Sequence, residues 1–494
     1  MNLFITKPVT PAPRVDAGEP VEGGIEGTES LQRVLTARHL VLLGIGAVIG
    51  AGIFVLTGQA AANHAGPAIT ISFVLAGVAC ALAGLCYAEF AAMLPVSGSA
   101  YSYSYATLGE FVAWFIGWNL VLEYLFAAST VAVGWSGYFN SLLHSISDIT
   151  GFPLGLPASL ASAPLNVVDG RLVATGAVIN LPAVLIIAAI GALCYRGMQQ
   201  SAFVNSIIVA IKLVVILMFV AFSLKYVDVS NWAPYVPPAE GPGRFGWDGV
   251  VRGASIVFFA YIGFDAVSTA AQEAKNPQRD MPIGILGSLV LCTALYIVVS
   301  AVLTGMLPYT LLGTAKPVAT ALEAYPSLLW LKTIVEIGAI AGLSSVILVM
   351  MIGQTRIFYT MSHDGLIGRM FGRVHSRYHT PHRGTIFVGV IAAVLAGLLP
   401  IGVLGDLVSM GTLLAFATVC IGVLVLRHTK PDLPRSFRVP LAPVICPLGA
   451  VTCLWLFSRA FEDNWHWMTG WIIVGFIIYF GYGYRHSALR QQRR

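Results

Sequence analysis

Long apolar stretches dominate the chain, and short segments rich in charged, proline and glycine residues separate them. A helix needs about 20 predominantly apolar residues to cross the ~30 Å hydrocarbon core of a bilayer. Twelve stretches meet this requirement, at roughly residues 39–62, 68–93, 105–143, 177–195, 202–225, 250–272, 282–306, 332–361, 384–400, 404–426, 441–460 and 467–484. The pattern therefore predicts an all-α integral membrane protein with about 12 transmembrane helices.

Composition supports this interpretation. Hydrophobic residues make up 57% of the 494 residues and charged residues 10%, whereas about 25% of residues in ordinary soluble domains are charged. A soluble fold could not cover its surface with so few charges, so we expect lipid to surround most of the chain. The seven cysteines lie in or beside apolar runs without zinc-site spacing, and we expect neither a metal nor a cofactor.

The basic residues predict the orientation. With the N-terminus inside, the cytoplasmic segments hold 20 of the 28 Lys and Arg residues and the outer loops hold seven. Cytoplasmic loops of membrane proteins carry such an excess, so we expect both termini to be cytoplasmic. The net charge of +5 is then a topology signal, and no nucleic-acid partner is expected.

Two apolar stretches do not resemble simple lipid-facing helices. The first carries Gly44, Gly46, Gly50 and Gly52 within nine residues, and each glycine in a helix interior costs ~1 kcal/mol relative to alanine. Close packing of small residues would explain the pair Gly46 and Gly50. It would not explain Gly50 and Gly52, because residues i and i+2 lie on different helix faces. We therefore predict an interruption there.

The second interruption is predicted in the sixth stretch, around Gly263 and Asp265. The first and sixth stretches would open two five-helix halves, and interrupted helices in matching positions are typical of inverted-repeat transporters. We predict a five-plus-five inverted repeat with broken helices 1 and 6, plus two extra C-terminal helices. The predicted boundaries are a disordered cytoplasmic tail at 1–30, repeats at 31–225 and 226–430, helices 11 and 12 at 431–484, and a basic cytoplasmic tail at 485–494.

Ionisable residues deep in apolar stretches are candidate functional residues. Lys212 lies ~13 Å or more from either end of its predicted helix, at 1.5 Å per residue, too far for its side chain to reach water. It either makes a fixed contact with backbone carbonyls or takes part in function, and function is the favoured interpretation. Glu123 and Asp265 are also deep, and each could pair with a substrate, a proton or a neighbouring residue. Ser344 and Ser345 could bond to their own backbone or line a cation site.

Several segments together resemble one family. They are GAVIGAGIF at 46–54 and the stretches 54–58, 87–90, 95–101, 117–124, 258–269, 273–282 and 361–365. The first resembles the span-one signature of the amino acid–polyamine–organocation superfamily, and the set resembles its cationic amino acid transporter family. The short tails are similar to those of bacterial members. The resemblance covers residues 31–484 and implies a multi-pass protein of the bacterial inner membrane.

The resemblance also implies a site. It would bind a substrate carboxylate at the N–H groups of Gly50, Ala51 and Gly52. The substrate amine would meet carbonyls near Val48 and Ile49, and near Phe259, Ala260 and Ile262. Lys212 matches a lysine that replaces a sodium ion in proton-coupled relatives, and it would lie between the first interruption and Ser344 and Ser345. Glu123 is a further candidate substrate-binding residue.

These features predict a transporter, with no enzymatic activity. We expect a secondary active transporter of amino acids, driven by protons through alternating access, and the alternative is an exchanger or uniporter for cationic amino acids or polyamines. A membrane-embedded hydrolase would need a nucleophile and base or metal ligands at depth, and the sequence contains no HExxH motif. The sequence predicts neither the rank of substrates nor the oligomeric state.

Overall fold

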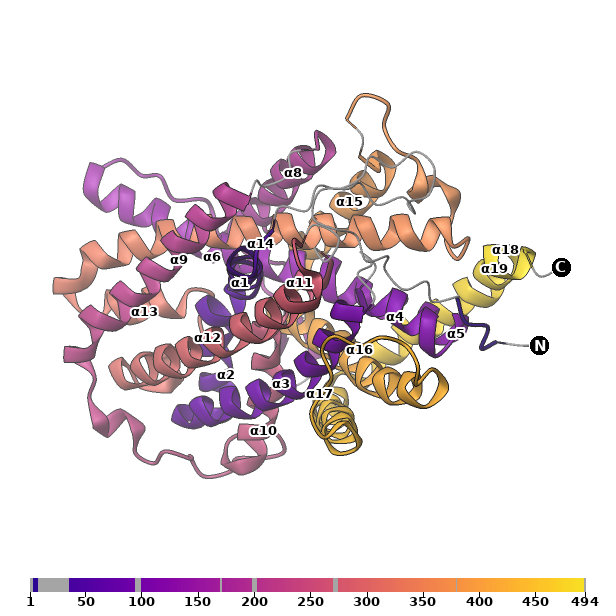
Figure 1. The fold of residues 1–494 in the computed structure, drawn as a ribbon. Helices are drawn as coiled ribbons and strands as arrows, with labels where there is room; N and C mark the ends of the chain where they lie inside the picture. Colours follow the sequence, from indigo (N-terminus) through magenta and orange to yellow (C-terminus); the bar gives the residue numbers. More distant parts are fainter. Residues whose placement is uncertain are drawn as a thin grey trace.

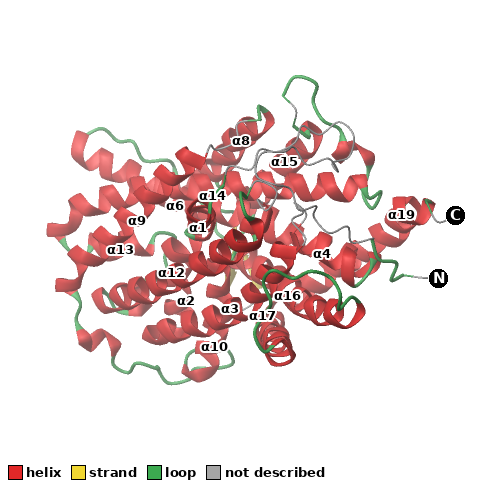
Figure 2. Ribbon diagram, in the orientation of Figure 1, coloured by secondary structure: helices red, strands yellow, loops and turns green. Residues whose placement is uncertain are grey.

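A computed structural model describes residues 3–7, 35–93, 99–168, 171–197, 202–269, 274–378 and 380–492. Helices joined by loops form most of this part of the chain, as Figure 2 shows. The exception is a small antiparallel hairpin of β1 (Leu165–Val168) and β2 (Arg171–Ala174). The protein is therefore an all-α membrane protein, as the apolar stretches predict.

Among the described residues, eight helical stretches are long and apolar enough to cross a membrane. They are Gly52–Met93, Glu110–Thr150, Val204–Tyr226, Gly246–Ser268, Pro277–Met306, Pro326–His363, Ile401–Thr429 and Ala442–Gln491. Three shorter apolar helices accompany them, α1 (Ala37–Val48), α8 (Leu181–Tyr195) and α15 (His382–Leu398). Eight differs from twelve for two reasons. Neighbouring predicted stretches join in Gly52–Met93 and in Ala442–Gln491, and the predicted stretches 177–195 and 384–400 correspond to the shorter helices α8 and α15. The inverted repeat and its boundaries remain predictions.

The remaining regular α-helical elements, within these stretches and between them, have the following bounds. They are α2 (Thr57–Ala60), α3 (Ile69–Met93), α4 (Ser99–Thr107), α5 (Glu110–Val121), α6 (Ala127–Thr150), α7 (Ala158–Ala161), α9 (Ala202–Ser223), α10 (Gly246–Val257), α11 (Ala266–Thr269), α12 (Pro277–Met306), α13 (Pro317–Glu323), α14 (Leu329–His363), α16 (Ile401–Thr429), α17 (Ala442–Ile478), α18 (Tyr484–His486) and α19 (Ala488–Gln491). Figure 1 shows α1 in the middle of the bundle, and α17 to α19 along one edge.

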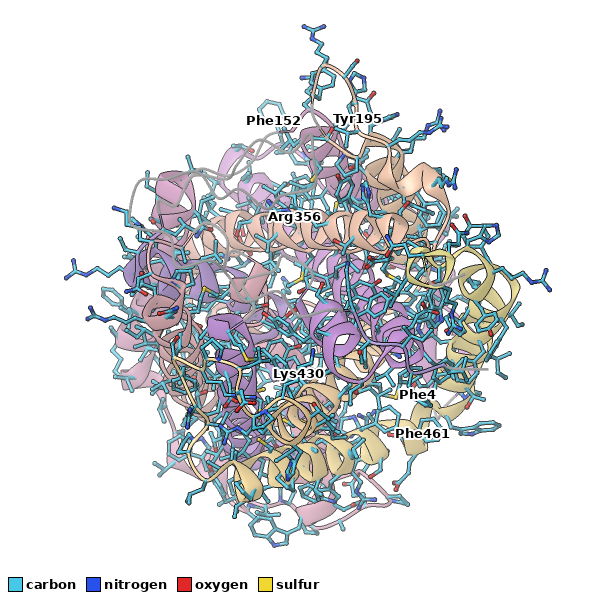
Figure 3. The ribbon with its side chains drawn as sticks, turned by 45° about the vertical axis from the view of Figure 1, so that its right-hand side comes forward. Phe4, Phe152, Tyr195, Arg356, Lys430 and Phe461 are labelled. Atoms are coloured by element: carbon cyan, nitrogen blue, oxygen red, sulfur yellow. The ribbon has the colours of Figure 1, made fainter. Side chains whose placement is uncertain are left out.

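Peripheral helices turn apolar side chains outward. On α9, Ile211, Val214 and Leu217 are 44–54% exposed, whereas Lys212 on the same helix is fully buried. An exposed stripe of large apolar residues is suited to lipid, because lipid tails replace the apolar partners that water cannot provide. Between the helices, side chains fill the interior (Figure 3). The helix that contacts lipid on one side thus directs its one charge inward.

The first residues of the chain pack against the bundle. Ile5 accepts a backbone hydrogen bond from Glu110 at 3.0 Å, and Lys7 donates one to Tyr105 at 3.1 Å. The Lys7 ammonium also pairs with Asp364 at 2.7 Å. Both marked ends of the chain lie on the same side of the molecule (Figure 1). Residues 1, 2 and 8–30 of the predicted tail lie outside the described part.

A buried ion pair joins α10 to the kink of α17. The Arg252 guanidinium, 4% exposed, binds both oxygens of Asp406, at 3.2 and 2.7 Å, and one of Asp463 at 2.7 Å. Asn464, whose backbone is non-helical at φ −124° and ψ 23°, donates to Asp406 at 2.7 Å. The guanidinium thus holds α10, α16, which carries Asp406, and α17 together through charge-assisted hydrogen bonds, which are stronger than neutral ones.

We expect Arg252→Met to lower the stability of the purified protein markedly. The substitution leaves the Asp406 carboxylate without its cation, and breaking a buried pair costs about 3–5 kcal/mol. Thermal unfolding in detergent measures the effect, with a fall in the midpoint of roughly 5 °C or more expected. Arg244→Met is the control, because Arg244 pairs with Glu240 at 3.5 Å on an exposed surface. Equal midpoints for the two variants would contradict a structural role for Arg252.

Candidate functional site

The first predicted interruption is present at the end of α1. The helix ends at Val48, Ile49 is extended at φ −74° and ψ 98°, and helical structure resumes as a π-helical turn over Gly52–Leu56. The N–H groups at the start of a helix lack intrahelical acceptors, and the carbonyls at the end of one lack donors. This interruption therefore presents both kinds of backbone group inside an apolar interior.

The second interruption lies directly against the first. The helix α10 ends at Val257 and continues as a 3₁₀ turn over Phe258–Tyr261. Ile262 is then extended, at ψ 133°, and Gly263 has φ +118°, a conformation that favours glycine. A Cβ on Gly52 would lie 2.3 Å from the Cα of Ala260. The absence of a side chain at Gly52 thus allows the two interrupted segments to touch.

A small cavity lies between the interruptions. Its volume of about 10 Å³ is close to the minimum that one water molecule needs. The lining residues are Ala47, Val48, Gly50, Ala51, Gly52, Ala127, Val131, Phe259, Ile262, Val346 and Met350. Every side chain in this set is apolar, so the polar groups available to a ligand are those of the backbone. An amino acid is larger than the cavity, so it enters only if the surrounding helices separate.

Lys212 reaches the first interruption. Its ammonium donates to the carbonyl of Gly46 at 2.7 Å and to that of Ile49 at 3.0 Å. A Cβ on Gly342 of α14 would lie 3.0 Å from the Lys212 Cε, so the aliphatic part of the side chain passes over a glycine. Lys212 thus links α9 to the end of α1 across a fully buried contact.

The two serines next to this lysine in the predicted site bond elsewhere. The Ser344 hydroxyl donates to the Ile340 carbonyl at 2.8 Å and accepts from the Trp135 indole at 3.0 Å. The Ser345 hydroxyl donates to the Gly342 carbonyl at 2.8 Å. In this conformation the Ser345 hydroxyl bonds within α14, and the Ser344 hydroxyl bonds within α14 and to Trp135 of α6.

Tyr296 of α12 is a site residue that the sequence analysis missed. Its hydroxyl lies 2.9 Å from the Val48 carbonyl and 2.8 Å from the Ala260 carbonyl. A hydroxyl has one hydrogen, so it donates to one interrupted segment at a time while touching both. In the sequence, Tyr296 is a tyrosine in the middle of an apolar stretch. That pattern does not distinguish a site residue from a core residue.

The candidate substrate-binding residues fall into three groups. Val48, Gly50, Ala51, Gly52, Phe259 and Ile262 line the cavity. Ile49 and Ala260 are not among the lining residues, and their carbonyls accept from Lys212 and Tyr296 respectively. Glu123 does not line the cavity. Ala127, Val131, Val346 and Met350 do, and nothing in the sequence distinguished them from other apolar residues of their helices.

Glu123 and Asp265 lie together on another side of the interruptions. The two carboxyl groups are close enough to interact electrostatically. Asp265 also accepts from the Tyr124 hydroxyl at 2.6 Å and from the Gly263 N–H at 3.2 Å. Both acids are fully buried. Within the described part of the chain, no three His, Cys, Asp or Glu residues are grouped so that they could hold a metal ion.

Comparisons with known proteins agree with this architecture. A family model described as amino acid permease matches residues 35–480. The chain is 47% identical over 464 residues to the methylthioribose transporter of Bacillus subtilis (strain 168), which covers 94% of the chain and 96% of that protein. It is 46% identical over 471 residues to the branched-chain amino acid permease BcaP of the same organism, with the same coverage of 94% and 96%. It is 38% identical over 412 residues to cationic amino acid transporter 4 of Mus musculus, which covers 82% of the chain and 62% of that protein.

The contact between the interruptions predicts a graded response to added methyl groups. We expect Gly52→Ala to lower the unfolding midpoint most, because the new Cβ would meet backbone at 2.3 Å and overpacking costs about 1–3 kcal/mol. Gly50→Ala should have a smaller effect, since its Cβ meets the Val346 side chain at 3.2 Å. Gly402→Ala is the control, with no atom within 4 Å. Thermal unfolding of the three purified variants tests the order, and a midpoint for Gly52→Ala equal to that of Gly402→Ala would contradict it.

Proposed function

This chain belongs to the amino acid permease family, and from that membership we propose that it is a proton-coupled symporter of amino acids that works by alternating access in the cell membrane. The transport of amino acids follows from the family. The coupling ion, the site residues and the substrate class are the parts that we propose. One observation carries the coupling, namely the contact of the Lys212 ammonium with the interrupted end of α1.

The protonation state of Lys212 affects how firmly α9 is held to α1. A protonated lysine has three donors, and two of them bond to the carbonyls of Gly46 and Ile49. Bonds from a charged donor are roughly twice as strong as neutral ones, so loss of the proton weakens the link. If protonation stabilises one arrangement of the helices more than another, the equilibrium between the two arrangements shifts by the difference between the two stabilisation free energies. Proton binding thus biases the protein toward the arrangement in which α1 and α9 are joined.

The interruptions supply groups for both ends of an amino acid backbone. A substrate carboxylate is placed at the N–H groups of Gly50, Ala51 and Gly52, where a helix start favours an anion. The substrate amine is placed among the carbonyls of Val48, Ile49, Phe259, Ala260 and Ile262. Tyr296 and Lys212 contact three of these carbonyls. A bound amine therefore shares those carbonyls or displaces the Tyr296 hydroxyl, which makes substrate binding sensitive to both residues.

The side-chain end of the cavity favours neutral, apolar substrates. We call the residues Ala127, Val131, Val346 and Met350 the apolar wall. A cationic side chain against this wall would lose its hydration without gaining a counter-charge, which is costly in the membrane interior. The apolar wall therefore supports amino acids with small or branched aliphatic side chains over the alternative of a cationic amino acid or polyamine exchanger.

Substitution of Lys212 tests the coupling. We expect Lys212→Met, which keeps the volume of the side chain but has no titratable group, to abolish accumulation of substrate driven by an inward proton gradient. The measurement is uptake of radiolabelled leucine or alanine into proteoliposomes without sodium. Lys225→Met is the control, because Lys225 is exposed near the end of the same helical stretch.

Two results would contradict the proposal in different ways. If Lys212→Met still accumulates substrate in response to the proton gradient, Lys212 is not the coupling residue. If the wild-type protein requires sodium, proton coupling itself is wrong.

A substrate panel tests the role of the apolar wall. A ligand that binds only the folded protein raises the unfolding midpoint according to RT ln(1 + [L]/Kd). We expect alanine, valine and leucine to stabilise the purified protein, and arginine, lysine and putrescine at the same concentration to have little effect. Stabilisation by arginine alone would overturn the neutral assignment and favour the cationic alternative.

A further inference from the structure

A buried polar layer lies one helical turn from the cavity. Glu123 comes one turn before Ala127, Gln354 comes one turn after Met350, and Asp265 follows Ile262 by three residues. Ala127, Met350 and Ile262 all line the cavity. Residues one turn apart on a helix share a face, which applies to Glu123 and Gln354, whereas Asp265 follows Ile262 through the second interruption. Glu123 lies in a π-helical turn, Leu122–Phe126, and such turns often occur at functional sites. The layer is therefore adjacent to the amino acid site but separate from its lining.

Asp265 has the donors that an ionised carboxylate needs. The Tyr124 hydroxyl donates to one of its oxygens at 2.6 Å, and the Gly263 N–H donates to the other at 3.2 Å. Hydrogen bonds to the charged form of a carboxyl group favour that form. The conformation of Gly263, with φ +118°, places this N–H next to the second interruption. Asp265 is therefore the better acceptor of the two acids.

Glu123 has no such donors. Neither of its oxygens has a hydrogen-bond donor among the described residues. Thr412 lies nearby, but its hydroxyl hydrogen is directed to the Val408 carbonyl at 3.0 Å. An ionised carboxylate without donors or a cation is strongly disfavoured in an apolar interior. A protonated Glu123, by contrast, can donate its own hydrogen to the carboxylate of Asp265.

Among the residues that the structure describes, no cation pairs with Glu123 or Asp265. The titratable neighbours of these two acids are Tyr124 on the helix of Glu123, Tyr87 and Cys80 of α3, and Tyr103 of α4. From α16 the neighbouring polar group is Thr412, which carries no charge. None of the ion pairs in the described ranges includes Glu123 or Asp265. Two like charges in contact cannot both ionise readily without such a cation.

We infer that Glu123 and Asp265 together form a proton-binding site, in which Glu123 carries the proton and donates it to Asp265. The site is separate from Lys212, and its use in transport rests on the proposed symport. Binding converts two carboxylates into one neutral carboxylic acid hydrogen-bonded to one carboxylate. Release returns the proton to water and leaves both groups ionised.

The structure also provides a way to release this proton. Asp265 follows the second interruption, whereas Glu123 lies on the continuous helical stretch Glu110–Thr150. A rotation of the segment after Gly263 would separate the carboxyl groups and admit water. Gln354 is fully buried, and both polar atoms of its amide lack a hydrogen-bond partner. Its amide offers the first hydrogen bonds to water that enters the layer, because buried unsatisfied groups gain free energy when they are hydrated.

Infrared spectroscopy of the purified protein tests the protonation state directly. We expect the wild-type protein at neutral pH to show the C=O stretching band of a protonated carboxylic acid, and Glu123→Gln to lack it. Glu110→Gln is the matched control, because Glu110 is equally buried but accepts from Arg490 at 2.6 Å and from Tyr479 at 3.0 Å. The band should persist in Glu110→Gln and in Lys212→Met. A wild-type spectrum without the band, or a band that Glu123→Gln leaves unchanged, overturns the proton site whatever the role of Lys212.

Counting protons tests whether the site takes part in transport. We expect the number of protons carried per amino acid, measured in proteoliposomes with a pH-sensitive dye and labelled substrate, to fall by one in Glu123→Gln relative to wild type. An unchanged ratio would show that the proton stays bound throughout the cycle, which overturns the release step. Loss of gradient-driven uptake in Lys212→Met together with an unchanged ratio in Glu123→Gln would support the proposed function and reject the use of this second proton.

Discussion

Two helices are interrupted within an apolar interior, and their exposed backbone groups must be satisfied there. In a bilayer no water reaches such groups, and each one left without a partner costs several kcal/mol. The structure meets this requirement with donors from other helices. Lys212 of α9 serves the carbonyls of Gly46 and Ile49, and Tyr296 of α12 serves those of Val48 and Ala260. The positions of α9 and α12 therefore depend on the conformation of the two interruptions.

This arrangement makes the interior responsive to ligands and protons. Because the same carbonyls are proposed to bind a substrate amine, substrate competes with the Tyr296 hydroxyl for them. Because one donor is an ammonium, a proton changes the strength of the link to α9. The contact between Gly52 and Ala260 keeps the cavity small in this conformation, so binding requires that the helices separate. Proton and substrate thus act on one set of backbone groups, which is the physical basis of the proposed coupling.

The buried acidic side chains lie outside the cavity, beyond the apolar wall. The wall itself is apolar, and the acids Glu123 and Asp265 lie one turn beyond it. That separation lets a neutral side chain pack against Val346 and Met350 without meeting a charge. It also keeps the carboxyl pair dry while the helices are closed, which favours the shared proton. In contrast, the buried Glu110 has Arg490 as a cation partner at 2.6 Å, so burial alone does not decide which acids carry a proton.

The sequence by itself determined the membrane-embedded helical class, the two interruptions and the burial of Lys212, because apolar length, clustered glycines and a charge deep in an apolar stretch are local signals. The number of separate membrane helices stays a prediction, because Gly52–Met93 and Ala442–Gln491 each join two of the predicted stretches through an irregular turn, at Gly66 with φ +59° and at the kink of Asn464. Tertiary structure alone decided which donors meet the exposed carbonyls, that Glu123 faces Asp265 and is absent from the cavity lining, and that Tyr296, Val346 and Met350 surround the site. An apolar residue in a buried helix looks the same in the sequence whether it faces a cavity, a neighbouring helix or lipid. Only the packing of helices distant in sequence distinguishes these environments.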